Sequence, residues 1–360
     1  MLADTTSLSI FGNLNSTQTR SSLAGMDFVT YATYWFNQYV IVPTICSLGI
    51  IGNVLSIVII VKSGLRRPSN IILFGLAISD TLTLTHVFDV SEYFYFQDSY
   101  CIHECSLLFF SYGPAFAILI FRAVLFFLSA LGGRLSTWIT VLITVERLIA
   151  VFNPLKLSRV MTRRRAWLAL GLAVLFWLPW SIFQIFWFQF HFEYDERFES
   201  YTAWDSNSDY LNNVNFDVGW FNNVVISQAT HTIPLIIVAV GSLAISIRLQ
   251  TIATKRQKII SSTSVQRSSS RTTKALLMVC VVYSITRFCF VIRNLPWFNS
   301  DGPTWSRVAM FYDIIRYLFV DVNSSCNFFI YVVFNPKFRH IFESLFTRHQ
   351  RMEDSESLYG

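Results

Sequence analysis

The chain has 360 residues, of which 53% are hydrophobic and only 14% charged, with a mean hydropathy of +0.46. A soluble domain cannot bury so large an apolar fraction, so this balance excludes an ordinary soluble protein and indicates an integral membrane protein. The six cysteines occur singly, and four of them lie in apolar stretches, which argues against a disulfide scaffold and against a zinc site.

Residues 1–37 form the segment that precedes the first apolar stretch. The first 25 residues are polar and show no apolar core of the kind that marks a cleavable signal peptide. Asn15-Ser16-Thr17 is a glycosylation sequon, which makes Asn15 a candidate modification site if this end of the chain faces a secretory lumen. We therefore expect 1–37 to be an extracellular N-terminal segment.

Seven apolar windows follow, each of about the 20 residues that a helix needs to cross a bilayer. They fall near 38–62, 70–94, 115–150, 166–189, 220–248, 272–295 and 306–333. The sequence therefore predicts an all-α fold, with a seven-transmembrane helix bundle over 38–334. The serine-rich stretch 261–270, between the fifth and sixth windows, is predicted to be a flexible loop.

The segment 335–360 is predicted to hold a short amphipathic helix followed by a cytoplasmic tail. Beyond Asn335-Pro336, apolar residues recur at positions 338, 341, 342, 345 and 346. This spacing places them on one face of a helix that lies on the membrane surface.

Lysine and arginine gather on one side of the predicted bundle. Of the 28 Lys and Arg residues, 19 fall in the alternate connections and the tail, whereas the opposite connections are acidic. Cytoplasmic connections carry an excess of Lys and Arg, so we expect a multi-pass protein of the plasma membrane with its N-terminus outside and its C-terminus inside. The net charge of +6 is then a topology signal, and it gives no support for a nucleic-acid partner.

Two of the predicted helices carry polar stripes within the membrane. At 100° per residue, one face of the third holds Arg122, Ser129, Ser136, Thr140 and Arg147 within about 40° of one another. A similar face of the seventh holds Asp313, Tyr317, Ser324, Asn327 and Tyr331. Ionisable groups in a membrane usually face the bundle interior, so the stripes predict a hydrated interior.

From about residue 38 to 346, residues within these helices resemble the motifs of rhodopsin-like G-protein-coupled receptors. The strongest match is Glu146-Arg147-Leu148, followed by Pro154-Leu155, which is similar to the family's acidic-Arg-aromatic motif and the next loop. The other matches, in chain order, are Gly52-Asn53, Leu76-Ala77-Ile78-Ser79-Asp80, Trp177, Pro179, Pro234 and Asn327-Phe328-Phe329-Ile330-Tyr331, where Phe328 replaces a proline. The chain is most similar to invertebrate peptide-type receptors and the chemosensory receptors related to them.

The resemblance implies activation of a heterotrimeric G protein by an extracellular ligand. Coupling and activation would then depend on Glu146, Arg147, Pro154, Leu155, Asn327 and Tyr331. A second set matches the family's sodium-and-water cluster, in which a sodium ion near Asp80 would be the one cofactor: Asp80, Ser136, Asn323, Ser324 and Asn327. No other cofactor and no further metal is expected.

Departures from the family pattern reduce the number of ligand classes that fit this sequence. Arg122 stands where the family keeps a cysteine, so the usual disulfide cannot form, and Cys101 and Cys105 either pair with each other or stay free. Ser129 replaces the aspartate of amine receptors, which disfavours an amine. A peptide or a small charged chemosensory ligand is expected instead, at Arg122, Ser129, Arg134, Arg287, Arg293, Asp313, Arg316 and Asp321.

Two alternatives stay open at this stage. The charges in the outer half can neutralise one another as internal pairs without binding a ligand, and Arg287 can pair with a ligand carboxylate or with Asp321 or Asp80. Charged stripes within a bundle also build the paths of transporters and channels, although these predict inverted repeats or broken helices that the sequence does not show. No pairing of nucleophile and base indicates an enzyme.

Overall fold

The structure is a computed structural model that describes residues 32–33, 35–89, 107–109, 112–195, 200–207, 220–257, 264–293 and 303–345. Within them, seven helices are long and apolar enough to cross a membrane, which confirms the predicted seven-helix bundle. The candidate spans are Asn37–Ser63, Pro68–Phe88, Phe116–Phe152, Arg163–Phe186, Val224–Ile252, Ala275–Ile292 and Ile314–Phe334.

The spans are built from long α-helices, three of which are extended by short turns of other helix types. The α-helices are α3 (Val42–Ser63), α4 (Pro68–Thr83), α6 (Tyr112–Phe152), α8 (Arg163–Trp187), α10 (Ile233–Gln257), α11 (Ser264–Arg293) and α12 (Pro303–Phe334). The π-helical turns η1 (Asn37–Ile41), η4 (Phe221–Ile226) and η5 (Gln228–Thr232) precede α3 and α10, and the 3₁₀ turn η2 (Leu84–Phe88) continues α4.

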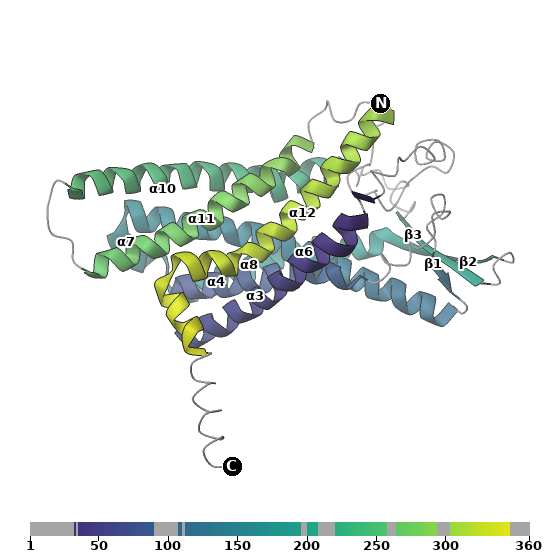
Figure 1. Ribbon diagram of the computed structural model, residues 1–360, viewed down its shortest axis with the longest axis horizontal. Helices are drawn as coiled ribbons and strands as arrows, with labels where there is room; N and C mark the ends of the chain where they lie inside the picture. The colour runs from purple at the N-terminus through teal and green to yellow at the C-terminus, as the bar shows by residue number, and fades with distance from the viewer. Residues whose placement is uncertain are drawn as a thin grey trace, which may run out of the picture.

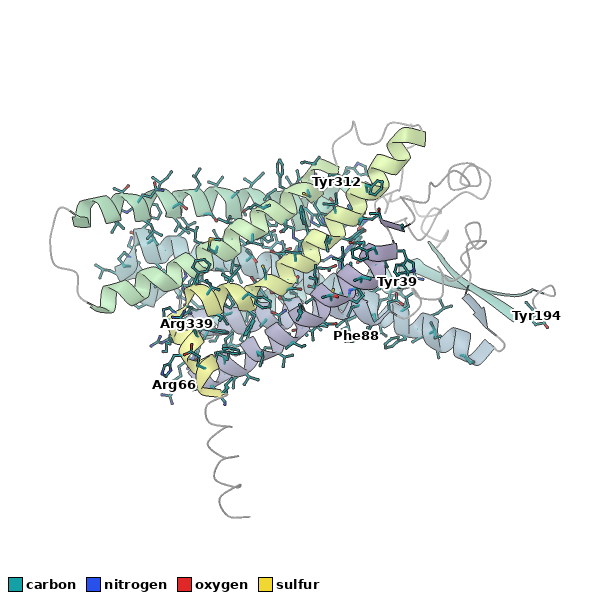
Figure 2. The ribbon with its side chains drawn as sticks, in the orientation of Figure 1. Tyr39, Arg66, Phe88, Tyr194, Tyr312 and Arg339 are labelled. Atoms are coloured by element: carbon teal, nitrogen blue, oxygen red, sulfur yellow. The ribbon has the colours of Figure 1, made fainter. Side chains whose placement is uncertain are left out.

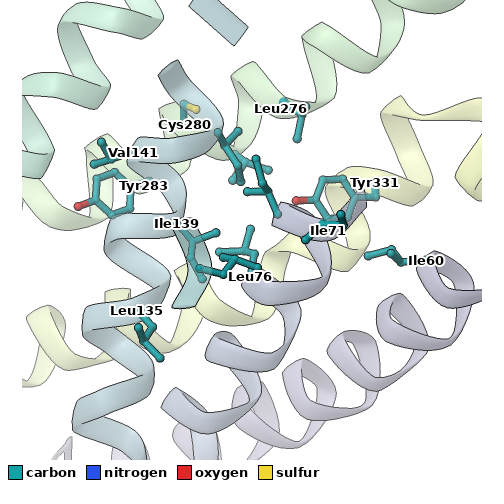
Figure 3. Close-up of a cluster of buried hydrophobic side chains, with 14 of the residues drawn as sticks. Ile60, Ile71, Leu76, Leu135, Ile139, Val141, Leu276, Cys280, Tyr283 and Tyr331 are labelled. Atoms are coloured by element: carbon teal, nitrogen blue, oxygen red, sulfur yellow. The ribbon is translucent and has the colours of Figure 1, made fainter. Parts of the chain in front are cut away.

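Helix α6 lies at the centre of the bundle, where it contacts α4, α8, α10 and α11, while α12 packs against α3, α11 and α4 (Figure 1). The apolar core fills the space between these helices. Figure 3 shows Leu76 of α4 beside Ile139 of α6, with Tyr331 of α12 near Ile71. All four side chains are at most 3% exposed, so the core ties together helices that are distant in sequence.

Helices α4 and α6 cross at unusually short range, and Gly132 makes this possible. A Cβ atom on Gly132 would lie 2.5 Å from the backbone nitrogen of Thr83 and 2.7 Å from the carbonyl oxygen of Ser79. Nearby, Ser129 Oγ donates a hydrogen bond to the Thr83 carbonyl oxygen at 2.7 Å. Small residues at such crossings let two membrane helices bring their backbones together.

A small antiparallel sheet lies at one end of the bundle, which we call the sheet end (Figure 1). Its strands β1 (Leu107–Phe109), β2 (Phe188–Asp195) and β3 (Ser200–Asn207) have the order β1-β3-β2. Cross-strand pairs include Leu108 with Thr202 and His191 with Trp204. An all-α fold does not include these strands, although β2 alternates aromatic and polar residues with the two-residue period of a β-strand.

The opposite end, which we call the tail end, holds α7 (Pro154–Val160) and a short helix over 336–345. Figure 2 shows Arg66 and Arg339 at the tail end and Tyr194 at the sheet end. The short helix packs on α12 through aromatic rings, with centroids 5.5 Å apart for Phe328 and Phe342 and 5.6 Å apart for Tyr331 and Phe338. It lies where the apolar spacing predicted a surface helix.

The prediction of a flexible loop over 261–270 is wrong from Ser264 onward. Helix α11 begins at Ser264 and runs through the serine-rich stretch, so the sixth helix is longer than its apolar window. Serine is only mildly unfavourable in a helix, and a helix already stabilised by its membrane part can extend through such residues.

Candidate functional site

Asp80 is the centre of a polar cluster between α4, α6 and α12. Its side chain is fully buried, and each carboxylate oxygen accepts one hydrogen bond: Oδ1 from Ser136 Oγ and Oδ2 from Asn327 Nδ2, both at 2.6 Å. Asn53 of α3 donates from Nδ2 to the carbonyl oxygen of Ser324 at 2.9 Å, which links the cluster to the first helix. Four helices therefore meet at one buried carboxylate.

Several oxygens in and beside this cluster have no hydrogen-bond partner within the described residues. Asn53 Oδ1 and Asn327 Oδ1 are both buried in this way. Asn323 is buried as well, at 3% exposure, and its carbonyl oxygen accepts a hydrogen bond from Cys326 Sγ at 3.4 Å. Buried amide oxygens without partners are costly, and they are the kind of group that water or a hard cation satisfies.

Glu146 and Arg147 form an ion pair near the tail end of α6. Arg147 Nη2 lies 3.0 Å from both carboxylate oxygens of Glu146. Ser69 of α4 completes the group, because its Oγ donates to Glu146 Oε1 at 2.5 Å and accepts from Arg147 Nη2 at 3.0 Å. Glu146 is only 3% exposed, so this group ties α6 to α4 through a charge pair shielded from solvent.

Three other residues predicted to act in coupling, Pro154, Leu155 and Tyr331, lie on the tail side, and they differ in exposure. Leu155 in α7 is 92% exposed. Pro154 begins α7 and follows directly on the end of α6. Tyr331 of α12 is buried, and its hydroxyl has no hydrogen-bond partner within the described residues.

A basic and aromatic cluster lies between α10, α11 and α12, and Arg287 is its central residue. The Arg287 side chain is 3% exposed, and its Nε and Nη2 atoms have no hydrogen-bond partner within the described part of the chain. Its Cζ atom lies 5.7 Å from the ring centroid of Tyr283 and 5.5 Å from that of Phe290. Rings offer a cation partial compensation, well below that of a paired carboxylate.

Arg316 and His231 surround the same Phe290 ring. The Arg316 Cζ atom lies 4.7 Å from the centroid of Phe290, and the His231 ring stacks on Phe290 with centroids 4.5 Å apart. Arg316 is 4% exposed. Two buried guanidinium groups around one aromatic ring make this region strongly favourable for an anion.

Both acidic residues proposed as internal partners of Arg287 are engaged elsewhere. Asp80 is held by Ser136 and Asn327, and Asp321 Oδ1 lies 3.5 Å from His86 Nε2. Neither carboxylate forms an ion pair with Arg287 in the described residues. Within the described residues no close ion pair joins Arg287 to either of these two acids, although the opposite charges of Arg287 and Asp80 attract each other across the bundle.

The other predicted ligand residues have varied surroundings. Arg134 donates to Ser181 Oγ at 2.9 Å and to Gln184 Oε1 at 2.6 Å, so it joins α6 to α8. Arg122 Nε lies 3.8 Å from Asp89 Oδ2, which is an internal pair. Ser129 bonds to the backbone of α4. These residues hold helices together, and Arg134 also lies within electrostatic range of His231, as Arg287 and Arg316 do.

Some predictions fall on parts of the chain that the structure does not describe. Asn15, Cys101 and Cys105 lie outside the described residues, and so do the side chains of Arg293 and Asp313. Three residues that the sequence analysis did not select prove to be part of these clusters: Ser69, His86 and His231. A lone serine or histidine in an apolar window carries no periodic signal, although both histidines could have been noted as polar residues within predicted spans.

Comparison with known proteins places the chain in a family. Residues 39–349 match the family model of the serpentine type 7TM GPCR chemoreceptor Srw. The chain is 26% identical to the FMRFamide receptor of Drosophila melanogaster over 89% of its own length, which is 55% of that protein. It is 24% identical to neuromedin-U receptor 2 of Mus musculus, over 85% of this chain and 74% of the relative.

The chain thus spans only about half the length of the FMRFamide receptor that it matches. The alternative of a transporter or channel finds no support in these matches. Seven membrane-spanning helices and a family match over 39–349 agree with each other, and they show that this chain belongs to the serpentine seven-transmembrane GPCR chemoreceptor family Srw.

Proposed function

We propose that the chain is a receptor that binds an extracellular peptide and activates a heterotrimeric G protein. In this proposal the bundle receives an anionic group of the ligand at Arg287. The names of the FMRFamide and neuromedin-U receptors support a peptide ligand. The observation that carries the proposal is the buried guanidinium of Arg287, whose Nε and Nη2 have no hydrogen-bond partner in the described residues.

Burial of a guanidinium with unpaired N–H groups is costly within a membrane span. Arg287 lies within the span Ala275–Ile292. Insertion of a guanidinium into the membrane costs several kcal/mol even on lenient scales, so such a residue persists where it serves a function. A ligand carboxylate would supply the missing acceptors in a bidentate geometry. Tyr283 and Phe290 flank the guanidinium and would exclude water around that pair.

The orientation in the proposal follows from charge. The basic connections and tail lie at the tail end, where Figure 2 labels Arg66 and Arg339, and an excess of Lys and Arg marks the cytoplasmic side. The sheet end would then face outside and admit the ligand. The tail end would face the G protein, with Arg147 and the exposed Leu155 on that side.

The proposal also includes a sodium ion near Asp80. The buried oxygens Asn53 Oδ1 and Asn327 Oδ1 lack partners within the described residues and would fit a hard cation beside the carboxylate. Such an ion would neutralise Asp80 within the membrane and hold α3, α4, α6 and α12 in one arrangement.

The test begins with a panel of peptides, some acidic and some C-terminally amidated, applied to cells that express the chain with a G-protein activation readout. The first agonist found is then remade with its carboxylate replaced by an amide. Both forms are titrated on the parent, on Arg287→Gln and on Arg248→Gln, which removes an exposed charge from α10 as a matched control.

A charge-assisted hydrogen bond is worth about 1.5–3 kcal/mol, which corresponds to roughly a 10- to 150-fold loss of affinity. We expect that loss in Arg287→Gln and for the amide analogue on the parent, without a further loss when both changes are combined. Independent, additive losses would show that the carboxylate binds elsewhere. Activation of no G protein by any peptide or small acid in the panel would count against the receptor proposal itself.

A further inference from the structure

A cysteine, a histidine and an aspartate from three helices meet near the sheet end of the bundle. Cys46 lies in α3, His86 in η2 and Asp321 in α12. Cys46 Sγ is 4.0 Å from His86 Nε2, and His86 Nε2 is 3.5 Å from Asp321 Oδ1. All three potential ligand atoms lie within 4.8 Å of one another. Asp321 belongs to the ligand residues expected from the sequence, but the proposed contact of the peptide with Arg287 uses none of these three side chains.

The orientation of the His86 ring is fixed by the backbone. Its Nδ1 atom lies 2.9 Å from the carbonyl oxygen of Thr83, which can only accept a hydrogen bond, so Nδ1 carries a proton. Nε2 therefore points at Cys46 and Asp321. A histidine that donates one ring N–H to a backbone carbonyl and presents the other nitrogen to a cluster has the arrangement of a metal ligand.

This arrangement requires a proton or a cation between the His86 ring and the Asp321 carboxyl group. A neutral His86 ring would turn the lone pair of Nε2 toward an ionised Asp321 carboxylate, and two acceptors repel each other. Asp321 is 3% exposed and Cys46 is fully buried, so bulk water does not relieve that repulsion. A second proton on the ring, a proton on the carboxyl group or a metal ion can each resolve it.

We propose that Cys46, His86 and Asp321 bind a zinc ion. A thiolate, an imidazole and a carboxylate match the ligand set of Zn²⁺, whereas Ca²⁺ and Mg²⁺ prefer oxygen ligands alone. On binding, the Cys46 thiol gives its proton to water. The thiolate and carboxylate then balance the two charges of the ion, which makes the loaded site neutral within the membrane.

Two of the three distances between ligand atoms are close to those of a zinc site. Zinc bonds of about 2.0–2.3 Å in a tetrahedral site place neighbouring ligand atoms about 3.4–3.7 Å apart. The observed separations are 3.5 Å for His86–Asp321 and 4.0 Å for Cys46–His86, and all three ligand atoms lie within 4.8 Å of one another, so the Cys46 side chain has to move inward when the ion binds. Three protein ligands leave a fourth position for water or for a ligand group, as in zinc sites that remain open.

The three side chains differ in exposure, and their surroundings are largely apolar. The His86 side chain is 36% exposed, whereas that of Asp321 is 4% exposed. Val42, Leu84 and Leu318 form an apolar cluster with Cys46 at this site. An apolar shell around a polar centre strengthens electrostatic binding. A bound ion would cross-link α3, η2 and α12.

The experiment uses the full chain purified in detergent, with Zn²⁺ and Co²⁺ as probes. Metal content is measured after passage over a chelating column, for the parent and for Cys46→Ser, His86→Ala and Asp321→Asn. Cys280→Ala is the matched control, because Cys280 is also a buried thiol in a membrane helix but contacts Thr144 instead. Thermal melting of each protein, with and without zinc, reports folding independently of signalling.

We expect one zinc ion per chain in the parent and in Cys280→Ala, and at least a tenfold weaker affinity in each variant of the three ligands. X-ray absorption should show one sulfur at about 2.3 Å with N/O ligands at about 2.0–2.2 Å, and Co²⁺ should give thiolate charge-transfer bands that Cys46→Ser abolishes. Zinc should raise the melting temperature of the parent and leave that of Cys46→Ser unchanged.

Three results would overturn the assignment. Retention of zinc by Cys46→Ser or Asp321→Asn at the parental level would mean that other histidines bind it. Absence of zinc binding by a folded parent would leave His86 and Asp321 as a protonated ion pair. An absorption spectrum without a sulfur ligand would exclude Cys46. None of these results bears on whether Arg287 binds a peptide, so the two proposals fail separately.

Discussion

His86 Nε2 lies 3.5 Å from Asp321 Oδ1, so one of the two acids expected as internal partners of Arg287 contacts a histidine instead. Because Asp80 is also engaged, by Ser136 and Asn327, two of the buried acids contribute to helix packing while one buried guanidinium keeps unpaired N–H groups within the described residues. Asp80 and Asp321 therefore hold helices together, whereas Arg287 is suited to bind a ligand.

The first prediction is that substitution of Arg134 lowers the stability of the receptor and leaves its affinity for the ligand nearly unchanged. Arg134→Met removes two hydrogen bonds and leaves Ser181 Oγ and Gln184 Oε1 buried without that partner. Each such loss costs about 1–3 kcal/mol, so we expect a lower melting temperature and a smaller surface population. Agonist affinity per folded receptor should stay within about threefold of the parent. A large loss of affinity at normal stability would instead place Arg134 in the ligand site.

The second prediction is that the pair Glu146 and Arg147 restrains the inactive state. Glu146→Gln weakens the contact of Arg147 with α6 and α4, and a change of about 1–2 kcal/mol shifts a two-state equilibrium by roughly 5- to 30-fold. We expect a raised basal G-protein activity in this variant. Arg147→Ala should remove activation while ligand binding stays measurable. Full signalling by Arg147→Ala at equal surface expression would contradict the assignment.

A third prediction tests the sodium ion proposed near Asp80. Sodium should lower agonist affinity in the parent several-fold. The ion binds the inactive conformation and the agonist binds the active one, so each weakens the binding of the other. Asp80→Asn keeps the size of the side chain but removes the charge that binds the ion, so its agonist affinity should not respond to sodium. Radioligand competition in sodium and in an organic-cation buffer of equal ionic strength measures the effect. An equal sodium response in both proteins would exclude Asp80 as the site.

The fourth prediction is that Gly132 cannot carry a side chain. Gly132→Ala would place a methyl group against the backbone of Thr83, which cannot move aside as a flexible side chain could. Overpacking of this kind costs about 1–3 kcal/mol, so the melting temperature and the yield of folded receptor should fall. Gly171→Ala in α8 is the control, since a Cβ atom there would meet nothing within 4 Å. Similar behaviour of the two variants would show that the α4–α6 crossing is adaptable.

Much of the architecture follows from the sequence alone. The number of spans, their approximate bounds and the polar faces of the third and seventh helices result from local composition and the 3.6-residue period, which do not depend on neighbouring helices. The resemblance to rhodopsin-like receptors, and not the periodicity, implies that Ser136 and Asn327 lie beside Asp80, where the structure shows both donating hydrogen bonds to its carboxylate. A family motif predicted the adjacency of Glu146 and Arg147, but the contribution of Ser69 was not foreseen.

Only the tertiary structure decided which charged group meets which. Asp321 could have paired with Arg287, and no pattern in the sequence favoured His86 over it. The expectation that the cysteines build no zinc site treated each one by itself, whereas Cys46, His86 and Asp321 come together from positions 40 and 235 residues apart along the chain. The rotation of each helix about its axis, together with the order of its neighbours, sets these contacts, and both depend on packing across the whole bundle.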